Sequence, residues 1–264
     1  MLSCIHDQAS AGQAAFTNES STGGWVNFYD NSTADHATFT NQAQVFSGVW
    51  FFDDSTAGNG TFINEGSDSY SYRGITYFVD SSTAGDGLFV TNGPLTTYYG
   101  YAQVSFFNTT KAGNGTFIAN GGKVPGAGGG VIDMTNFSSA ENGTFYANRG
   151  LVSGAFVGRV RFGIFDSTAA TATLIVTGGV GNGEGEGGGI LFEDSSAGAK
   201  ARVELVGNSF LDIRGHDTPR LRIGSLERDG LVFLEAVNLS VGSNNLSTEF
   251  SGLIEENSEG MTGR

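Results

Sequence analysis

The chain has 264 residues, including 42 Gly and 21 Phe, and its 27 Asp and Glu outnumber 13 Lys and Arg, giving a formal net charge of −14. Abundant aromatic residues exclude an intrinsically disordered chain, and the negative charge repels phosphate backbones, so we expect no nucleic-acid partner. The sequence contains no apolar run of about 18 residues, so it predicts no transmembrane helix. Cys4 is the single cysteine, so no intrachain disulfide can form.

A short turn motif made of an acidic or amide residue, a hydroxyl residue and an alanine repeats along the chain. Eight alanines align at spacings of 23, 23, 27, 28, 28, 29 and 28 residues: Ala11, Ala34, Ala57, Ala84, Ala112, Ala140, Ala169 and Ala197. Five residues after each of the first seven comes an apolar residue: Phe16, Phe39, Phe62, Phe89, Phe117, Phe145 and Leu174. The eighth copy has Arg202 there. A fixed period in this range predicts a stacked solenoid.

Each copy predicts short strands separated by turns. Asp or Asn precedes the alanine by four residues in most copies, as at Asp30, where its side chain can accept hydrogen bonds from backbone N–H groups. After the alanine, a small residue, an outward residue such as Thr61 and the large Phe62 alternate with the period of a strand. A second strand precedes the turn, as at residues 49–52, and a third, variable segment leads to the next copy. We therefore predict an all-β fold, a single-stranded right-handed parallel β-helix of about ten coils of 23–29 residues.

We expect one continuous β-helix domain over residues 1–264, with repeat coils over 1–205 and C-terminal coils over 206–264 that lead toward further β-strand repeats. The phenylalanines should form a ladder inside the tube, where each buried ring contributes roughly 1.5–3 kcal/mol. An asparagine ladder should run beside it: Asn18, Asn41, Asn64, Asn92, Asn120 and Asn148. The first three follow their Phe by two residues and the last three by three, which predicts one added residue and a change of turn shape. Stacked amides can hydrogen-bond along the axis, so we interpret this ladder as structural.

Residues 53–64, with the sequence Asp-Asp-Ser-Thr-Ala-Gly-Asn-Gly-Thr-Phe-Ile-Asn, resemble the passenger-type β-helix repeats of large bacterial surface and secreted proteins. The tail, residues 223–254, is similar to the segment that precedes autotransporter-associated β-strand repeats. A looser similarity to chlamydial polymorphic outer-membrane proteins comes from residues 89–92, 117–120 and 187–190.

This resemblance implies a non-enzymatic, extracellular or cell-surface β-helix with a structural or adhesive role, and a fragment of a larger protein. It implies as partner a host or environmental glycan or a surface protein, and it supplies no catalytic residues. Residues 1–7 contain no basic segment followed by an apolar one, so no signal peptide is visible in this chain. The polar end, residues 255–264, departs from the family pattern and leaves the anchor open.

Few residues suggest catalysis or metal binding. The three histidines, His6, His36 and His216, are far apart, and His216 lies in a late Arg-rich stretch that we interpret as a solvated or ion-paired surface rather than a catalytic cluster. Cys and His spacing typical of metal sites is absent, and we expect no cofactor. The one cation hypothesis is calcium at the turn carboxylates of Asp30, Asp53 and Asp80, against the alternative that these carboxylates accept only backbone N–H groups.

Six of the eight tyrosines lie between residues 70 and 101, and we consider five of them as a glycan platform: Tyr70, Tyr72, Tyr98, Tyr99 and Tyr101. Aromatic faces stack on sugar rings and their hydroxyls form hydrogen bonds, although such residues more often cover a corner. The alternative function is therefore a carbohydrate-binding or polysaccharide-lyase-like module that uses these tyrosines or the His216 region. Ice binding is a third hypothesis, which needs regular outward Thr rows, but paired outward Thr occurs only at Thr38 and Thr40.

Overall fold

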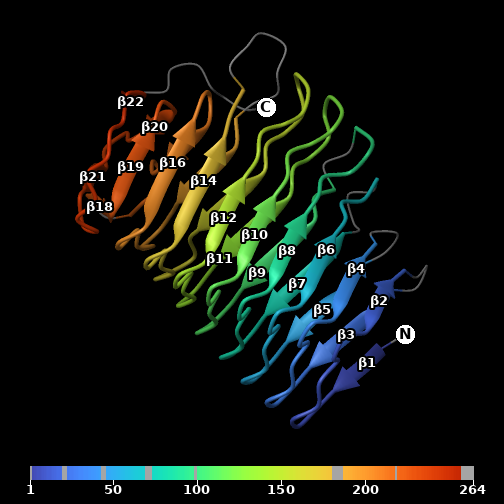
Figure 1. Cartoon of the computed structure of the whole chain (residues 1–264). Coiled ribbons are helices and arrows are strands. Elements are labelled where there is room, and N and C mark those ends of the chain that lie inside the picture. The colour runs from blue at the N-terminus through green and yellow to red at the C-terminus, as the bar shows by residue number, and fades with distance from the viewer. Residues whose placement is uncertain are drawn as a thin grey trace.

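The computed structural model describes residues 2–19, 23–42, 46–68, 73–97, 100–179, 187–217 and 219–256. These residues form 22 strands and no helix, and the coils stack in chain order into a rod (Figure 1). The named strands pair in parallel throughout, as β10 does with β12 and β8. The predicted all-β parallel β-helix is thus confirmed, with about 8 turns where the sequence predicted about ten. No described segment is a helix that is long and apolar enough to cross a membrane.

Two large sheets run along the rod, and most coils give one strand to each. The larger sheet has eleven strands: β1 (Leu2–Ile5), β3 (Trp25–Phe28), β5 (Ser47–Phe51), β7 (Gly74–Phe78), β9 (Gln103–Phe106), β11 (Val131–Met134), β13 (Arg159–Phe162), β15 (Gly189–Phe192), β17 (Phe210–Asp212), β20 (Leu231–Phe233) and β22 (Leu253–Glu255). The second has nine: β2 (Ala15–Asn18), β4 (Thr38–Asn41), β6 (Thr61–Asn64), β8 (Leu88–Thr91), β10 (Thr116–Ala119), β12 (Thr144–Ala147), β14 (Thr173–Thr177), β16 (Arg202–Val206) and β19 (Ser225–Arg228). In the tail, β18 (Arg220–Ile223) and β21 (Asn238–Val241) form a separate two-stranded sheet.

The third side of each coil is a single bridging residue inside the turn motif. Eight of these residues form a row of parallel bridges: Ser10, Thr33, Thr56, Thr83, Lys111, Ser139, Thr168 and Ala197. The expected third strand, between the Phe strand and the next copy, does not occur among the described residues. The repeat is therefore closed by a tight corner, and the variable segment is a loop whose length can differ from coil to coil.

The left-handed backbone of the corner explains its sequence. The first residue of the turn has φ between 53° and 60° at six successive corners: Asp7, Asp30, Asp53, Asp80, Asn108 and Asn136. Asp and Asn adopt this conformation at lower cost than other residues with a Cβ atom. Two residues later a small hydroxyl residue such as Ser32 is buried, and its Oγ donates to the Tyr29 carbonyl at 2.7 Å. The repeat alanines from Ala34 to Ala169 are fully buried against this corner.

The interior contains two phenylalanine ladders, one on each sheet. The rings of Phe16, Phe39, Phe62, Phe89, Phe117 and Phe145 stack at centroid distances of 4.6–5.0 Å. On the larger sheet, Phe28, Phe51, Phe78 and Phe106 stack at 4.6–4.9 Å, and the row continues through Met134 to Phe162 and Phe192. Rings of the two ladders meet edge to face at 5.5–6.2 Å. Both stacked and edge-to-face arrangements are favourable for aromatic pairs, so the ladders fill the tube along most of its length.

The asparagines form two ladders rather than one with an added residue. Asn18 donates to Asn41 at 2.7 Å and Asn41 to Asn64 at 2.6 Å, and all three are buried. The register then pairs Asn64 with Thr91, so no residue is added at this step and that prediction is wrong. Asn92, Asn120 and Asn148 form the second ladder one position later, where they are half-buried and hydrogen-bond at 2.9 Å. A shift by one residue moves a side chain to the other face of a strand.

Candidate functional site

The outward face of the eleven-stranded sheet has an unusual composition in its N-terminal half. Strand alternation turns Val49 and Phe51 of β5 into the core and leaves Trp50 on the outside. Six half-buried rings gather on this face, and we call them the aromatic cluster: Trp25, Tyr29, Trp50, Phe52, Tyr77 and Phe107. Trp50 contacts three of them, Trp25 at 6.2 Å, Phe52 at 5.5 Å and Tyr77 at 4.8 Å between ring centroids. The cluster is additional to the core, because the inward ladders already fill the tube.

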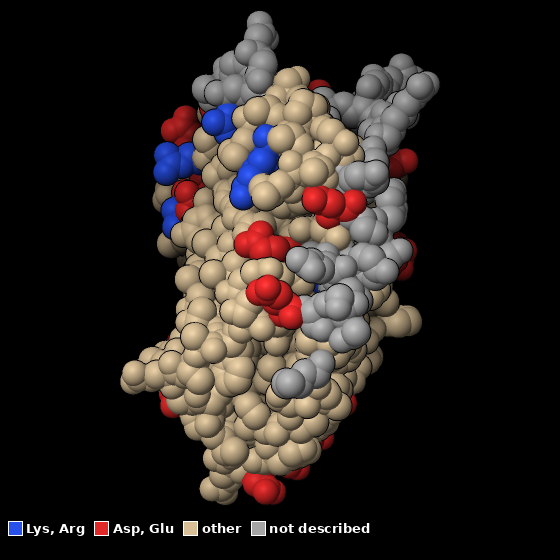
Figure 2. Space-filling view, turned by 90° about the vertical axis from the view of Figure 1, so that its right-hand side faces the viewer, with Lys and Arg blue, Asp and Glu red and all other residues tan. Residues whose placement is uncertain are grey.

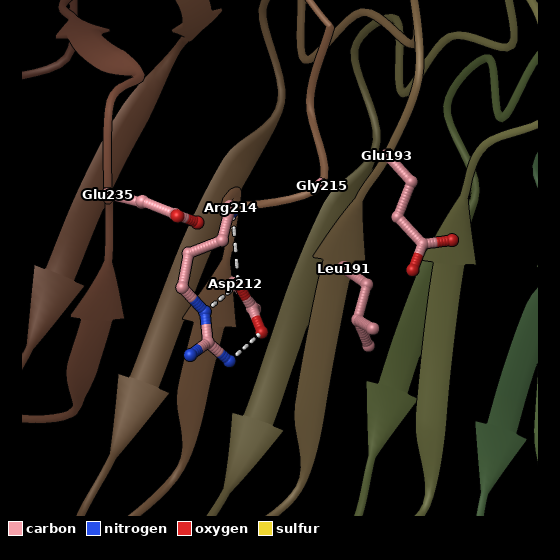
Figure 3. Close-up of a pocket in the computed structure, with 6 residues that line it drawn as sticks. All are labelled: Leu191, Glu193, Asp212, Arg214, Gly215 and Glu235. Carbon is pink, nitrogen blue, oxygen red and sulfur yellow. Dashed lines mark hydrogen bonds and ion pairs between the residues drawn. The ribbon is translucent and has the colours of Figure 1, made fainter. Parts of the chain in front are cut away.

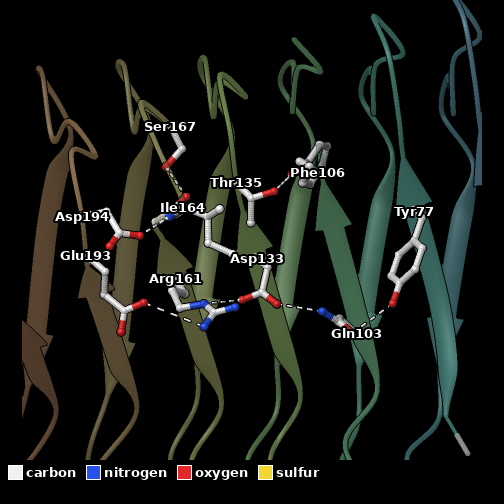
Figure 4. Close-up of polar contacts among 11 residues, drawn as sticks. Tyr77, Gln103, Phe106, Asp133, Thr135, Arg161, Ile164, Ser167, Glu193 and Asp194 are labelled. Atoms are coloured by element: carbon white, nitrogen blue, oxygen red, sulfur yellow. Dashed lines mark hydrogen bonds and ion pairs between the residues drawn. The ribbon is translucent and has the colours of Figure 1, made fainter. Parts of the chain in front are cut away.

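A chain of polar contacts continues from the aromatic cluster along the same face, and we call its five members the polar chain: Tyr77, Gln103, Asp133, Arg161 and Glu193 (Figure 4). The Tyr77 hydroxyl lies 3.2 Å from Gln103 Oε1, and Gln103 Nε2 donates to Asp133 Oδ2 at 2.7 Å. Arg161 Nε donates to Asp133 Oδ1 at 2.9 Å, and its Nη1 lies 3.8 Å from Glu193 Oε2. These contacts join strands β7, β9, β11 and β13 and the residue after β15.

Burial raises the pKa of both carboxyl groups in the polar chain. Asp133 is 4% exposed, and burial raises the pKa of its carboxyl, although Arg161 and Gln103 offset part of the rise. Burial also raises the pKa of Glu193, which Arg161 lowers in part. Burial opposes the charge of Arg161, yet the Asp133 carboxylate raises its pKa overall. Both oxygens of Asp133 accept hydrogen bonds, so this carboxylate positions Gln103 and Arg161 rather than facing solvent.

An open pocket of ≈ 280 Å³ lies at the C-terminal end of this face, lined by Leu191, Glu193, Asp212, Arg214, Gly215 and Glu235 (Figure 3). Arg214 donates to Asp212 from Nη2 at 2.6 Å and from Nε at 2.9 Å, and its guanidinium lies 5.1 Å from the Phe233 ring centroid. Glu193 and Glu235 lie on opposite sides of this pair (Figure 3). The lining therefore contains three carboxylates and one cation, and Glu193 connects the pocket to the polar chain.

Only part of the predicted tyrosine platform can be placed. Tyr70, Tyr72, Tyr98 and Tyr99 lie outside the described residues. Tyr101 is 36% exposed, and the guanidinium of Arg73 lies 4.9 Å from its ring centroid and 5.5 Å from that of Phe46. Tyr101 is close enough to Tyr77 and Arg161 to influence the pKa of each. It therefore borders the polar chain.

The turn carboxylates are engaged by backbone donors. The N–H of Asp7 donates to Asp30 Oδ2 and the N–H of Asp30 to Asp53 Oδ2, both at 3.0 Å, and the N–H of Asp53 lies 3.4 Å from Asp80 Oδ2. This geometry matches the alternative to calcium binding, in which the turn carboxylates accept hydrogen bonds from backbone N–H groups. Over the described part of the chain, no group of three or more His, Cys, Asp or Glu residues is arranged to hold a metal ion.

The histidines and the late arginines do not converge on one site. His6 lies 3.7 Å from Asp30 and His36 2.6 Å from Asp35, both at exposed corners. His216 is buried with Nε2 2.7 Å from the Ser196 carbonyl oxygen, and it does not line the pocket.

Ten of the 13 Lys and Arg occur from residue 149 onward. In the view of Figure 2 the Lys and Arg side chains that can be seen lie in the upper part of a largely uncharged face. Arg202 donates to both oxygens of Glu227, at 2.7 and 3.0 Å. Arg228 lies 3.7 Å from Glu204. These pairs match an ion-paired surface.

The outward face of the nine-stranded sheet carries a different pattern. One row contains Thr38, Thr61, Leu88, Thr116, Thr144 and Thr173 in register. The adjacent row is mainly β-branched and includes Thr40, Ile63 and the half-buried Tyr146. Thr thus forms a single interrupted row instead of paired rows. This face gives no added support to the ice-binding hypothesis, which stays a prediction.

Sequence reasoning missed the aromatic cluster and the polar chain. Trp50 was placed in a strand at residues 49–52, but the outward direction of its side chain was not used. Aligning that strand across copies puts Trp50, Tyr77, Ser105, Asp133 and Arg161 in one row, which would have identified the face.

The sequence matches no protein-family model, and searches for similar curated proteins and solved structures give no match. The similarity to passenger repeats therefore depends on the residues themselves.

Proposed function

We propose that this β-solenoid is a non-enzymatic scaffold that works outside the cell, as an adhesive, passenger-type part of a bacterial surface or secreted protein. Its partner would be a host or environmental glycan or a surface protein. The chain is a parallel β-solenoid scaffold. The single observation that carries the proposal is the difference between the inward and the outward side chains of its strands. Inward rows form a continuous core, while outward rows bear an aromatic cluster that the core does not need. Half-buried aromatic side chains gathered on one sheet face offer apolar surface and polar edges to a partner.

Retention of the folded chain on surfaces tests this proposal. Purified chain would be coupled to beads, and the beads would be washed under flow over polysaccharide films, protein films and cultured cells. Beads that carry the chain should resist detachment on at least one surface better than beads that carry albumin. Equal detachment on every surface would refute an adhesive role.

The alternative is a polysaccharide-active enzyme, and one observation favours it. Glu193 has a raised pKa and lies between Arg161 and the pocket that also contains Asp212 and Glu235. A carboxyl group with a raised pKa is what a general acid needs near neutral pH. Incubation with neutral and acidic polysaccharides, followed by assays for new reducing ends and for unsaturated uronates, distinguishes the two proposals. Turnover that Glu193→Gln abolishes would replace the scaffold proposal.

A further inference from the structure

The aromatic cluster and the polar chain form one continuous strip along the rod. It extends from Trp25 on β3 to Glu193 after β15, across seven neighbouring strands of the eleven-stranded sheet. At a strand spacing of ~4.8 Å this strip is about 29 Å long. One coil spacing is close to the length of one hexose unit in an extended chain, so an oligosaccharide laid parallel to the axis would meet one coil per sugar unit.

The side chains along the strip are those that bind sugars. Half-buried rings at the N-terminal end, Trp25, Trp50 and Tyr77, offer apolar surface with polar edges. Gln103 and Arg161 follow, each held in place by Asp133. Ser105 lies in the same outward row between Tyr77 and Asp133, and its Oγ is buried without a hydrogen-bond partner among the described residues. That oxygen is fully covered, so the ligand contacts fall on Gln103 and Arg161 instead.

The charge of the strip decides which class of glycan it fits. Arg161 is the one cation of the polar chain, and it is already paired with Asp133 and Glu193. The adjoining pocket adds two carboxylates and one guanidinium, and the whole chain carries a net charge of −14. Arg73 and the exposed Arg159 of β13 also lie beside the strip, so four guanidinium groups stand against the four carboxylates of the polar chain and the pocket. An anionic glycan therefore gains no net attraction from this balanced set, and the net charge of the whole chain repels it. A neutral glycan avoids this penalty.

We infer that the strip binds a neutral, extended oligosaccharide, with sugar rings on Trp25, Trp50 and Tyr77 and hydroxyl groups on Gln103 and Arg161. The inference rests on the proposed adhesive function and names the ligand class of its surface. It concerns binding only and assigns no reaction to the strip.

The chain contains its own reporter of binding, because its two tryptophans are Trp25 and Trp50. The full chain would first be screened on a printed array of neutral and anionic glycans. Each glycan that binds would then be titrated into the chain as its soluble hexaose, and the tryptophan emission should change until it saturates. Trp50→Ala should weaken binding about tenfold or more, as measured by calorimetry. Gln103→Ala, a second variant without a change in either tryptophan, should also weaken it.

Tyr146→Ala provides the matched control, because this tyrosine is outward and half-buried on the nine-stranded sheet. It should leave the affinity unchanged, and circular dichroism would verify the fold of each variant. Three results would overturn the inference: no neutral glycan bound on the array, binding restricted to anionic glycans, or equal affinities for wild type, Trp50→Ala and Gln103→Ala. If the array is negative while the beads still adhere to protein films, the adhesive proposal survives and the saccharide inference fails.

Discussion

Replacing one ring of the inner ladder should destabilise the rod far more than replacing an exposed ring. Phe62 is fully buried, stacked on Phe39 at 5.0 Å and Phe89 at 4.8 Å, and meets Phe51 edge to face at 5.6 Å. Substitution of a buried Phe by Ala costs about 3–5 kcal/mol, depending on how far the cavity collapses. The neighbouring rings are fixed by their own coils, so we expect the Phe62→Ala cost near 4 kcal/mol, around the middle of that range.

The assay is denaturant unfolding with two probes. Tryptophan emission reports β3 and β5, which carry Trp25 and Trp50, and circular dichroism reports the whole solenoid. Phe137→Ala is the control, because that ring is 61% exposed and the chemical change is the same. Both probes should show a large loss for Phe62→Ala and a change within about 0.5 kcal/mol for Phe137→Ala. Equal losses for the two variants would refute the ladder as the main source of stability.

A compensating substitution gives a second check. A Cβ atom at Gly60 would lie 2.9 Å from Cε2 of the Phe62 ring and 3.0 Å from the Ala57 carbonyl oxygen, so the ring is its nearest neighbour. Gly60→Ala should destabilise the wild-type chain, but in the Phe62→Ala background the new methyl group enters the cavity and should recover about 0.8 kcal/mol. Such a reversal of sign is an energetic coupling between neighbours. Additive effects would show that the cavity closes by other movements.

Four further outcomes follow from the corners, the ladder and the polar chain. Asp53→Ala should lower stability by about 1 kcal/mol because φ is positive there, and Asp53→Asn should be neutral in thermal unfolding. Asn41→Ala should cost about 1–3 kcal/mol in urea, since it removes the buried hydrogen bonds of Asn41 with Asn18, Asn64 and the Ile75 carbonyl. Arg161→Ala should cost about 2 kcal/mol near neutral pH. Burial already raises the Asp133 pKa, so the variant should regain stability as pH falls through that pKa and lose it as pH rises. A chelator should leave the melting temperature unchanged, because the corner carboxylates accept backbone N–H groups; a drop would support calcium.

The sequence predicted the solenoid well because its strongest signals are local and periodic. The spacing of Ala57 and Phe62 repeats in nearly every coil, and a repeat of this length has few architectures available to it. The turn chemistry was recognised, but its left-handed backbone was visible only in the structure. The asparagine ladder was misread, since sequence spacing from Phe does not show which face of a strand Asn92 occupies.

The candidate site could be predicted much less well, for a physical reason. Successive members of the polar chain are separated by 26 to 32 residues in the sequence, for example Tyr77 from Gln103 and Arg161 from Glu193. Their residue types do not repeat, so the repeat can place them in one outward row but does not mark them as a site. Their proximity follows only from the register of β7, β9 and β11, which depends on loops of unequal length between the coils.

The same alternation that stabilises the rod allows its outer face to change along the axis. On β9, β11 and β13 the inward residues are Val104, Ile132 and Val160, which are close in shape and fully buried. Their outward neighbours Ser105, Asp133 and Arg161 differ in size, polarity and charge. Substitution of an inward residue disturbs the packing of adjacent coils, whereas an outward residue is constrained mainly by its lateral contacts. A strip that passes from aromatic to polar side chains can therefore exist on a uniform core, and its ligand specificity can change without loss of the fold.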